Sequence, residues 1–132
     1  MTNSPTPPPP PDDRRPSSVY GVGGEPDVRF SLANERTALA WVRTGLALVA
    51  GGVAVTTLAA FADLSVVLDL LAALACIAGG ALAVSALFSW RRVERALRLG
   101  RPLPAPSALP WLVAGVSVLA ACFAAYAIIE AF

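Results

Sequence analysis

Three long apolar stretches without an Asp, Glu, Lys, Arg or His residue constrain the fold of this chain more than any other feature. They cover residues 44–62, 70–90 and 109–129. A helix rises about 1.5 Å per residue, so each stretch is long enough to cross a hydrocarbon core of roughly 30 Å. No comparable apolar run is left to build a water-soluble core. The sequence therefore predicts an all-α membrane protein with three transmembrane helices at about 42–62, 68–90 and 109–130.

The composition agrees with a membrane protein and disfavours an enzyme. Hydrophobic residues make up 56% of the chain and charged residues 14%, against about 25% charged residues in soluble domains. All 10 basic residues are arginines, and histidine, the commonest catalytic base and metal ligand, is missing. The sequence also shows no nucleophile paired with a base and no paired carboxylates on an inner face. We therefore expect no enzymatic activity, no cofactor, no metal and no nucleic-acid partner.

The arginines are distributed unequally between the predicted loops. Five precede the first span, five lie between the second and third spans, and the loop between the first two spans carries an aspartate and no arginine. The positive-inside rule places basic loops in the cytoplasm. It predicts a cytoplasmic N-terminus and a C-terminus outside the membrane.

The first membrane helix is expected to begin well before its span. Ser31 is a suitable N-cap, and Asn34 and Glu35 would lie in the first turn, where they suit the exposed amides and the helix dipole. About twelve residues then separate the cap from Arg43, which corresponds to roughly 18 Å of helix. The sequence thus predicts a cytoplasmic extension of the first helix.

The second helix is expected to extend in the complementary direction. Glu94 and Arg98 have the favourable four-residue spacing for an ion pair, and Gly100 followed by Pro102 ends the helix. Because the first two helices run antiparallel, their arginine-rich ends should meet on the cytoplasmic side of the membrane.

One face of the first helix combines arginines with small residues. At about 100° per residue, this face consists of Arg36, Ala40, Arg43, Ala47, Ala50 or Gly51, and Ala54. Small residues allow helices to approach closely inside a membrane. The face is therefore expected either to pack against another helix or to line a pore shared between subunits.

Residues 1–27 differ in composition from the rest of the chain. They are rich in proline, with an unbroken run at positions 7–11, and contain few large apolar side chains. Such a segment cannot bury enough apolar surface to offset the loss of chain entropy. We predict a disordered cytoplasmic tail over 1–27, followed by a three-helix transmembrane domain over 28–132.

Residues 29–44 read RFSLANERTALAWVRT, and the second span ends in Trp90 and Arg91. This pattern resembles the YidH-like family of small bacterial inner-membrane proteins, the domain of unknown function numbered 202, over about residues 28–132. The family is similar to the transmembrane module of the vacuolar transporter chaperone. That fungal complex makes polyphosphate and passes it through a channel built from several copies of a three-helix unit. The resemblance implies a location in the bacterial cytoplasmic (inner) membrane.

The resemblance also implies roles for particular residues. Arg29, Arg36 and Arg91 match positions whose basic side chains face the anionic polymer, and Glu35 matches a partner or gate. Arg43 is typical of the bacterial members, and it suits either snorkelling to the headgroups or contact with an anion. Glu35 suits either a helix-dipole group or a buried, paired acid, and the resemblance favours the second. The chain lacks a polymerase domain, so synthesis of polyphosphate is not expected.

Two functions follow as hypotheses. The first is an oligomeric module, built from this chain alone or with another membrane subunit, that binds or conducts phosphate-rich anions. Its anion-binding or ion-pair residues would be Arg29, Glu35, Arg36, Arg43 and Arg91. The alternative is a structural or regulatory scaffold that binds a protein partner or anionic membrane lipid.

Overall fold

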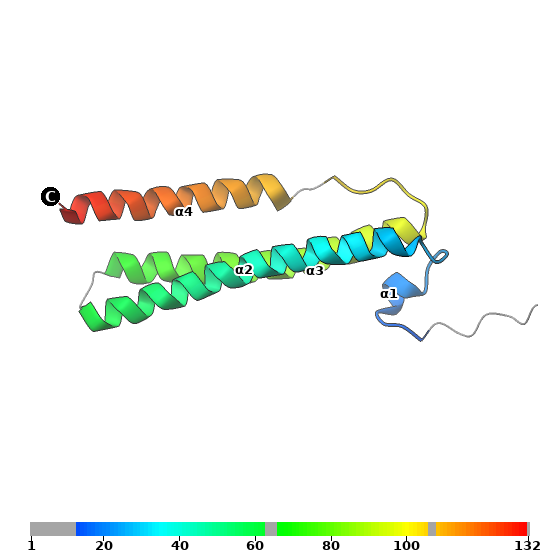
Figure 1. Cartoon of the computed structure of the whole chain (residues 1–132), viewed down its shortest axis with the longest axis horizontal. Coiled ribbons are helices and arrows are strands. Elements are labelled where there is room, and N and C mark those ends of the chain that lie inside the picture. Colours follow the sequence, from blue (N-terminus) through cyan, green and yellow to red (C-terminus); the bar gives the residue numbers. More distant parts are fainter. Residues whose placement is uncertain (1–12, 63–65, 106–107, 132) are drawn as a thin grey trace, which may run out of the picture.

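The computed structural model describes residues 13–62, 66–105 and 108–131. These residues form four helices and no strand: α1 (Ser17–Tyr20), α2 (Val28–Ala62), α3 (Val66–Arg98) and α4 (Ala108–Ala131). Figure 1 shows α2 and α3 side by side, α4 alongside but apart from them, and α1 near the start of α2. The predicted all-α fold is confirmed.

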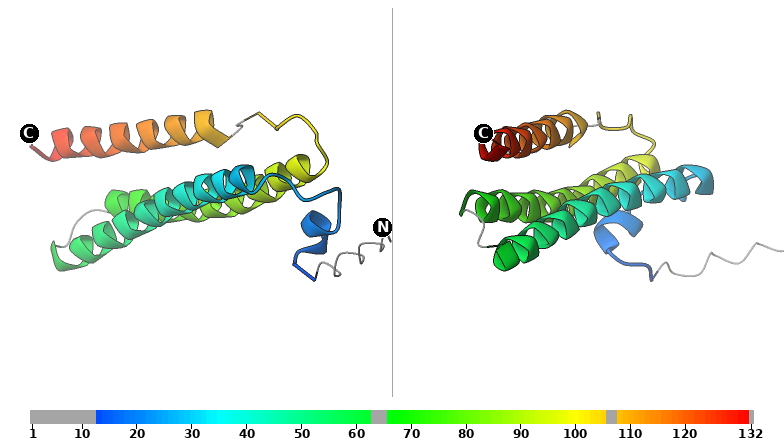
Figure 2. Two further views of the ribbon diagram at one scale, coloured as in Figure 1. Left: turned by 45° about the vertical axis from the view of Figure 1, so that its right-hand side comes forward. Right: turned by 60° about the vertical axis from the view of Figure 1, so that its left-hand side comes forward.

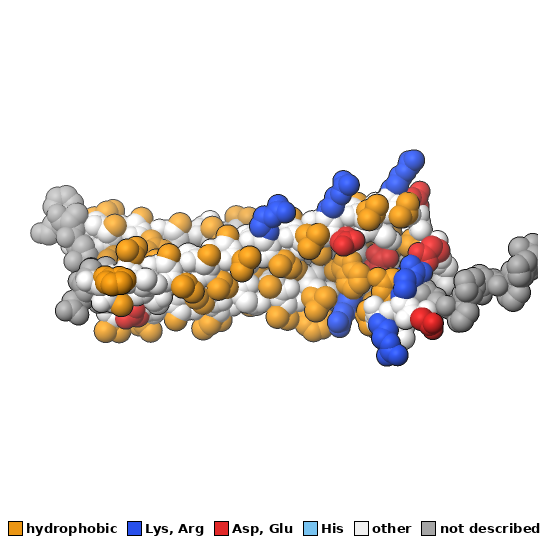
Figure 3. All heavy atoms as spheres, turned by 60° about the horizontal axis from the view of Figure 1, so that its bottom comes forward, with side chains coloured by type: hydrophobic (Ala, Val, Ile, Leu, Met, Phe, Trp, Pro, Cys, Tyr) orange, Lys and Arg blue, Asp and Glu red, His pale blue; other side chains and the backbone are white. Residues whose placement is uncertain are grey.

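Three of the helices are long and apolar enough to cross a membrane, over Val28–Phe61, Val66–Arg98 and Leu109–Ile129. The first two have 34 and 33 residues. Each is therefore about 50 Å long and exceeds the hydrocarbon core by roughly 20 Å. On the face shown in Figure 3, arginine side chains lie toward one end of the molecule, and hydrophobic side chains are spread along the rest of it. We call this arginine-rich end, where α2 begins and α3 ends, the charged end.

Helices α2 and α3 form an antiparallel hairpin along a seam of small residues. On α2 the residues turned toward α3 recur every seven positions, at Ser31, Ala38, Gly45, Gly52 and Ala59. On α3 the buried residues include Ala72, Ala75, Gly79, Leu82 and Ala86. A seven-residue repeat keeps one seam of a helix facing its partner, and small side chains bring the backbones close together.

The seam is narrowest where glycines meet. A Cβ atom added to Gly45 would lie 2.6 Å from the carbonyl oxygen of Gly79, and one added to Gly79 would overlap the carbonyl oxygen of Gly45. A Cβ atom at Gly52 would lie 2.6 Å from the Sγ atom of Cys76. A backbone carbonyl cannot rotate away as a side chain can. The contact between residues 45 and 79 therefore requires glycine on both helices.

Helix α4 makes little contact with the hairpin. Among the described residues its backbone comes close to that of α3 at a few places and to that of α2 at none, and both views in Figure 2 show it separated from the other two long helices. None of the residues in its most apolar window is buried. Its small residues, among them Ala114, Gly115, Ala120 and Ala121, are therefore exposed in the described part of the chain.

Helix α2 begins earlier than the sequence suggests. The backbone N–H of Arg29 donates to Oδ1 of Asp27 at 2.9 Å, and the N–H of Phe30 donates to the carbonyl oxygen of Asp27 at 3.0 Å. Asp27 therefore satisfies the first free amides, as an N-cap residue does. The prediction of Ser31 as the N-cap is wrong, because Ser31 lies one turn inside the helix.

Residues 13–27, which we call the strap, also differ from expectation. They include α1, and the backbone N–H of Gly24 donates to the carbonyl oxygen of Arg98 at 3.1 Å. The predicted disorder does not hold for these residues, whereas residues 1–12 lie outside the described part of the chain. The prediction of disorder from composition considers only the apolar area that a segment can bury by itself. Here the end of α3 supplies the surface against which residues 13–27 pack.

Candidate functional site

The charged end presents a row of arginines on the outer side of α2. Arg29, Arg36 and Arg43 recur every seven residues and are all exposed. Gly45, at the centre of the α3 seam, follows Arg36 by nine residues, which is about two and a half helical turns. The arginines therefore point directly away from α3. We call this surface the arginine face: it consists of Arg29, Arg36, Ala40, Arg43, Ala47 and Ala54.

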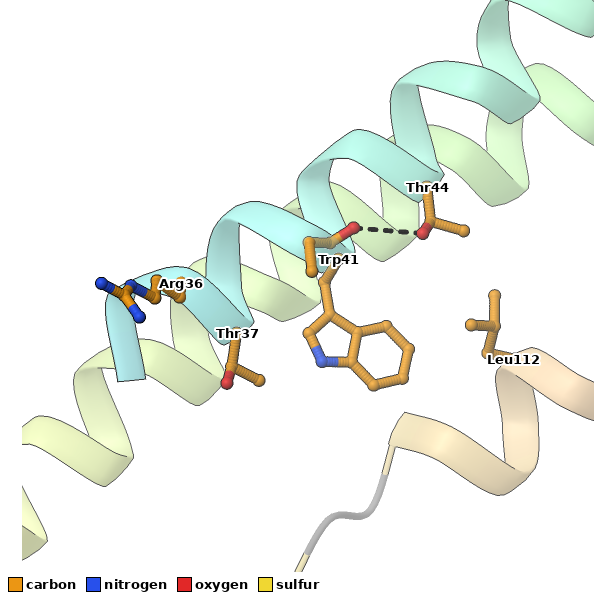
Figure 4. Close-up of a pocket in the computed structure, with 6 residues that line it drawn as sticks. Arg36, Thr37, Trp41, Thr44 and Leu112 are labelled. Atoms are coloured by element: carbon orange, nitrogen blue, oxygen red, sulfur yellow. Dashed lines mark hydrogen bonds between the residues drawn. The ribbon is translucent and has the colours of Figure 1, made fainter. Parts of the chain in front are cut away.

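A shallow pocket of about 400 Å³ opens beside Arg36, and Leu112 of α4 forms its far wall. Thr37 and Trp41 extend from α2 toward this space (Figure 4). The hydroxyl of Thr37 donates to the carbonyl oxygen of Ala33 at 3.0 Å, and Thr44 bonds Ala40 in the same way at 3.1 Å. With both hydroxyl protons used inside the helix, the donors left for an anion are the guanidinium of Arg36 and the indole N–H of Trp41.

The predicted site residues separate into two groups. Arg29, Arg36 and Arg43 lie together on the arginine face, whereas Glu35 and Arg91 lie elsewhere on α2 and α3. All five are exposed, and within the described residues none forms an ion pair with another side chain. Glu35 is therefore not a buried, paired acid within a single chain, contrary to the interpretation that the sequence favoured.

The buried acid at the charged end is Glu94 of α3, which is 3% exposed. Ser31 Oγ donates to Glu94 Oε1 at 2.8 Å, and Asn34 Nδ2 donates to Glu94 Oε2 at 3.2 Å. Asn34 also donates to the carbonyl oxygen of Trp90 at 3.2 Å. Ser31 and Asn34 thus connect α2 to α3 through side-chain hydrogen bonds, a role that sequence reasoning missed.

Glu94 shares the buried site with Arg98, which is 6% exposed. Arg98 Nε lies 3.8 Å from Glu94 Oε1, which confirms the predicted pair, and has no hydrogen-bond acceptor among the described residues. On its other side, Nη2 of Arg98 lies 3.4 Å from the Glu25 carboxylate, and the guanidinium lies 4.7 Å from the centre of the Tyr20 ring. Contacts from α2 and from the strap therefore surround this pair.

The two parts of the charged end differ in chemistry. The opposite charges of Glu94 and Arg98 offset each other, and both side chains are buried away from ligands. This buried pair therefore stabilises the hairpin. The arginine face carries accessible cations that can bind an anion. No cluster of three or more metal-ligating side chains occurs in the described residues.

Comparison with known proteins places these features in a family. Residues 29–96 match the domain of unknown function 202 (DUF202). The chain is 47% identical over 88 residues to the inner membrane protein YidH of Escherichia coli, with 67% of this chain and 76% of that protein covered. It is 39% identical over 102 residues to an uncharacterized protein of Mycobacterium tuberculosis, with 72% and 78% covered. No solved structure matches the chain.

Proposed function

This chain belongs to the DUF202 family and is a multi-pass membrane protein, and from that premise we propose that it is a subunit of an oligomeric module that conducts phosphate-rich anions. In this module the arginine faces of several copies surround a common axis. The module performs no catalysis of its own. Its charged end faces the cytoplasm, because the basic segments of membrane proteins are retained there.

The position of the arginine face opposite the α3 seam carries this proposal. Arg36 and Arg43 are exposed, and the small residues Ala40 and Ala47 lie between and beyond them on the same surface. An arginine that faces lipid costs roughly 3 kcal/mol at the membrane centre and less at the edge of the span, where Arg43 lies, and arginines within a span usually line protein interiors or water-filled paths. Small residues let a second helix approach this surface closely.

An axis lined by arginines also explains why the ligand should be an anion. Guanidinium groups from several copies would repel one another across a narrow path unless counter-charge lay between them. Phosphate groups supply that charge and accept two parallel hydrogen bonds from one guanidinium. A phosphate-rich anion therefore suits the charge and the hydrogen-bond donors of Arg29, Arg36 and Arg43.

A scaffold function is the alternative, and the position of α4 favours it. A groove of about 1180 Å³ lies between α4 and the hairpin, and its lining is mostly apolar. A protein helix or lipid chains would fill such a groove in the membrane. In a scaffold, the arginines would only contact headgroups, and no anion would cross.

Anion flux separates these functions. In liposomes that contain the purified protein, we expect pyrophosphate efflux, and we expect Arg36→Gln to reduce its rate by about tenfold. A charge-assisted hydrogen bond contributes roughly 1.5–3 kcal/mol, and about 1.4 kcal/mol corresponds to a tenfold change. Arg92→Gln is the matched control, because Arg92 is an exposed arginine on α3.

The control variant should keep the flux of the unchanged protein. If the unchanged protein shows no flux above that of empty liposomes, the anion-conducting function is wrong and the scaffold is favoured. Equal loss in both variants would mean that total charge, and not the arginine face, governs the flux.

A further inference from the structure

We infer that the strap is a releasable closure of the charged end, which hides Arg98 when it is docked and, when it leaves, opens the Arg98 guanidinium on α3 to a phosphate-bearing anion at a site separate from the arginine face of α2. The docking itself is a property of the single chain. Its regulatory role rests on the proposed anion function, and the two parts are tested separately below.

The strap is held at one small site by a few specific contacts. Val19 is its buried anchor, with 2% of its surface exposed. Tyr20 covers the guanidinium of Arg98 at 4.7 Å, and Glu25 lies 3.4 Å from Arg98 Nη2. Arg14 binds both oxygens of the same carboxylate, at 3.1 and 2.5 Å, and lies 5.0 Å from the Tyr20 ring. Glu25 thus bridges two arginines over one aromatic ring.

Gly23 shows that the docked strap has one defined conformation. Its φ angle is +65°, which side-chain-bearing residues rarely adopt. A Cβ atom at this position would also overlap the carbonyl oxygen of Arg98. That same oxygen accepts the N–H of Gly24 at 3.1 Å. The backbone therefore reaches Arg98 only because residue 23 has no side chain.

The same contacts make the strap easy to release. Helix α1 has 4 residues, too few to persist without the surface on which it lies. The side chains of Arg14 and Glu25 are exposed, and water screens exposed ion pairs so strongly that they add little stability. Segments with few buried contacts open at a free-energy cost well below that of global unfolding. The strap can therefore leave while the α2–α3 hairpin stays folded.

Release changes the charge that the charged end offers to a ligand. Arg98 would lose Glu25 and Tyr20 but keep Glu94, which Ser31 and Asn34 still hold. One face of its guanidinium would then be open to solvent. In the docked state the Tyr20 ring covers the guanidinium and the Glu25 carboxylate lies beside Nη2, so a phosphate-bearing anion must displace both. By linkage, an anion that binds the released state also promotes release.

Two neighbouring glycines provide a matched test of docking. Gly23→Ala should prevent docking, whereas Gly24→Ala should permit it, because no atom lies within 4 Å of a Cβ atom at Gly24. In hydrogen-exchange mass spectrometry on the full chain in nanodiscs, we expect amides 19–24 to exchange at least about tenfold faster in Gly23→Ala than in Gly24→Ala. Equal rates in the two variants and the unchanged protein would overturn the docked strap.

Pyrophosphate binding then tests the regulatory role. If the strap is docked about nine-tenths of the time, it lowers the apparent affinity of the site that it covers about tenfold. Gly23→Ala should recover that affinity, Gly24→Ala should not, and adding Arg98→Gln to Gly23→Ala should abolish the gain. Faster exchange in Gly23→Ala without tighter binding would leave the docked strap established and overturn its regulatory role. Loss of flux with Arg36→Gln remains a separate outcome, which tests the proposed function alone.

Discussion

Gly79→Val is expected to separate the α2–α3 hairpin and to lower the free energy of unfolding by about 3 kcal/mol or more, the upper end of the range for overpacked cores. The added side chain would overlap the carbonyl oxygen of Gly45 and press on Val49 and Leu48 of α2. A backbone carbonyl in a helix cannot move without breaking its own hydrogen bond. The helices would therefore have to move apart along the whole seam. Denaturant titration in mixed micelles, followed by tryptophan fluorescence, measures the loss.

The adjacent glycine provides the control for this prediction. Gly80 is exposed, and a Cβ atom there would meet nothing within 4 Å. Gly80→Val changes helix propensity by the same amount at nearly the same depth, so it isolates the contact between the helices. We expect it to shift the free energy of unfolding by no more than about 0.5 kcal/mol. Equal effects at Gly79 and Gly80 would show that the glycine seam does not hold the hairpin.

Glu94→Ala is expected to destabilise the charged end by about 3–5 kcal/mol, because it leaves Arg98 buried without its acid. It also removes the acceptor of Ser31 Oγ and one of the two acceptors of Asn34 Nδ2. Glu25 compensates little, because its side chain is exposed and water screens its interaction with Arg98. The same denaturant titration measures this loss.

Two variants make the Glu94 prediction specific. Glu35→Ala removes an exposed acid of α2 that is only one residue from Asn34, and its effect should stay within about 0.5 kcal/mol. Combining Glu94→Leu with Arg98→Met removes both buried charges and should recover much of the stability. If Glu35→Ala costs more than Glu94→Ala, the assignment of the buried acid is wrong.

The membrane helices were predictable because the bilayer imposes a simple requirement. A run of about 20 apolar residues has few stable alternatives to a transmembrane helix. The antiparallel meeting of the arginine-rich ends of α2 and α3 followed from the order and the lengths of the runs. The Glu94–Arg98 pair followed from helical spacing alone. All these features depend on local sequence.

The orientation of α2 about its own axis was harder to predict. A membrane helix is apolar on all sides, so polarity does not show which face packs against protein. The sequence therefore favoured the charged Glu35 as the residue with a buried partner. In the structure its neutral neighbour Asn34 makes the contact with Glu94. The available signal was the recurrence of small residues every seven positions from Ser31 to Ala59.

The strap and α4 show a second limit of sequence reasoning. Docking of the strap depends on Arg98, more than seventy residues away from Glu25 along the chain. The small residues of α4 do not identify a helix that would pack against them. The extensive exposure of α4 in a single chain agrees with the proposal that other subunits complete the structure.

Cysteine crosslinking in native membranes tests most directly whether the arginine face meets other copies of the chain. In a background with Cys76→Ala and Cys122→Ala, Ala47→Cys places a thiol on the arginine face, and Leu46→Cys places one at nearly the same depth on a different exposed face. With a membrane-permeable oxidant, we predict that Ala47→Cys forms disulfide-linked dimers in high yield and that Leu46→Cys stays largely monomeric. Efficient crosslinking through Leu46→Cys, with Ala47→Cys left monomeric, would contradict the account.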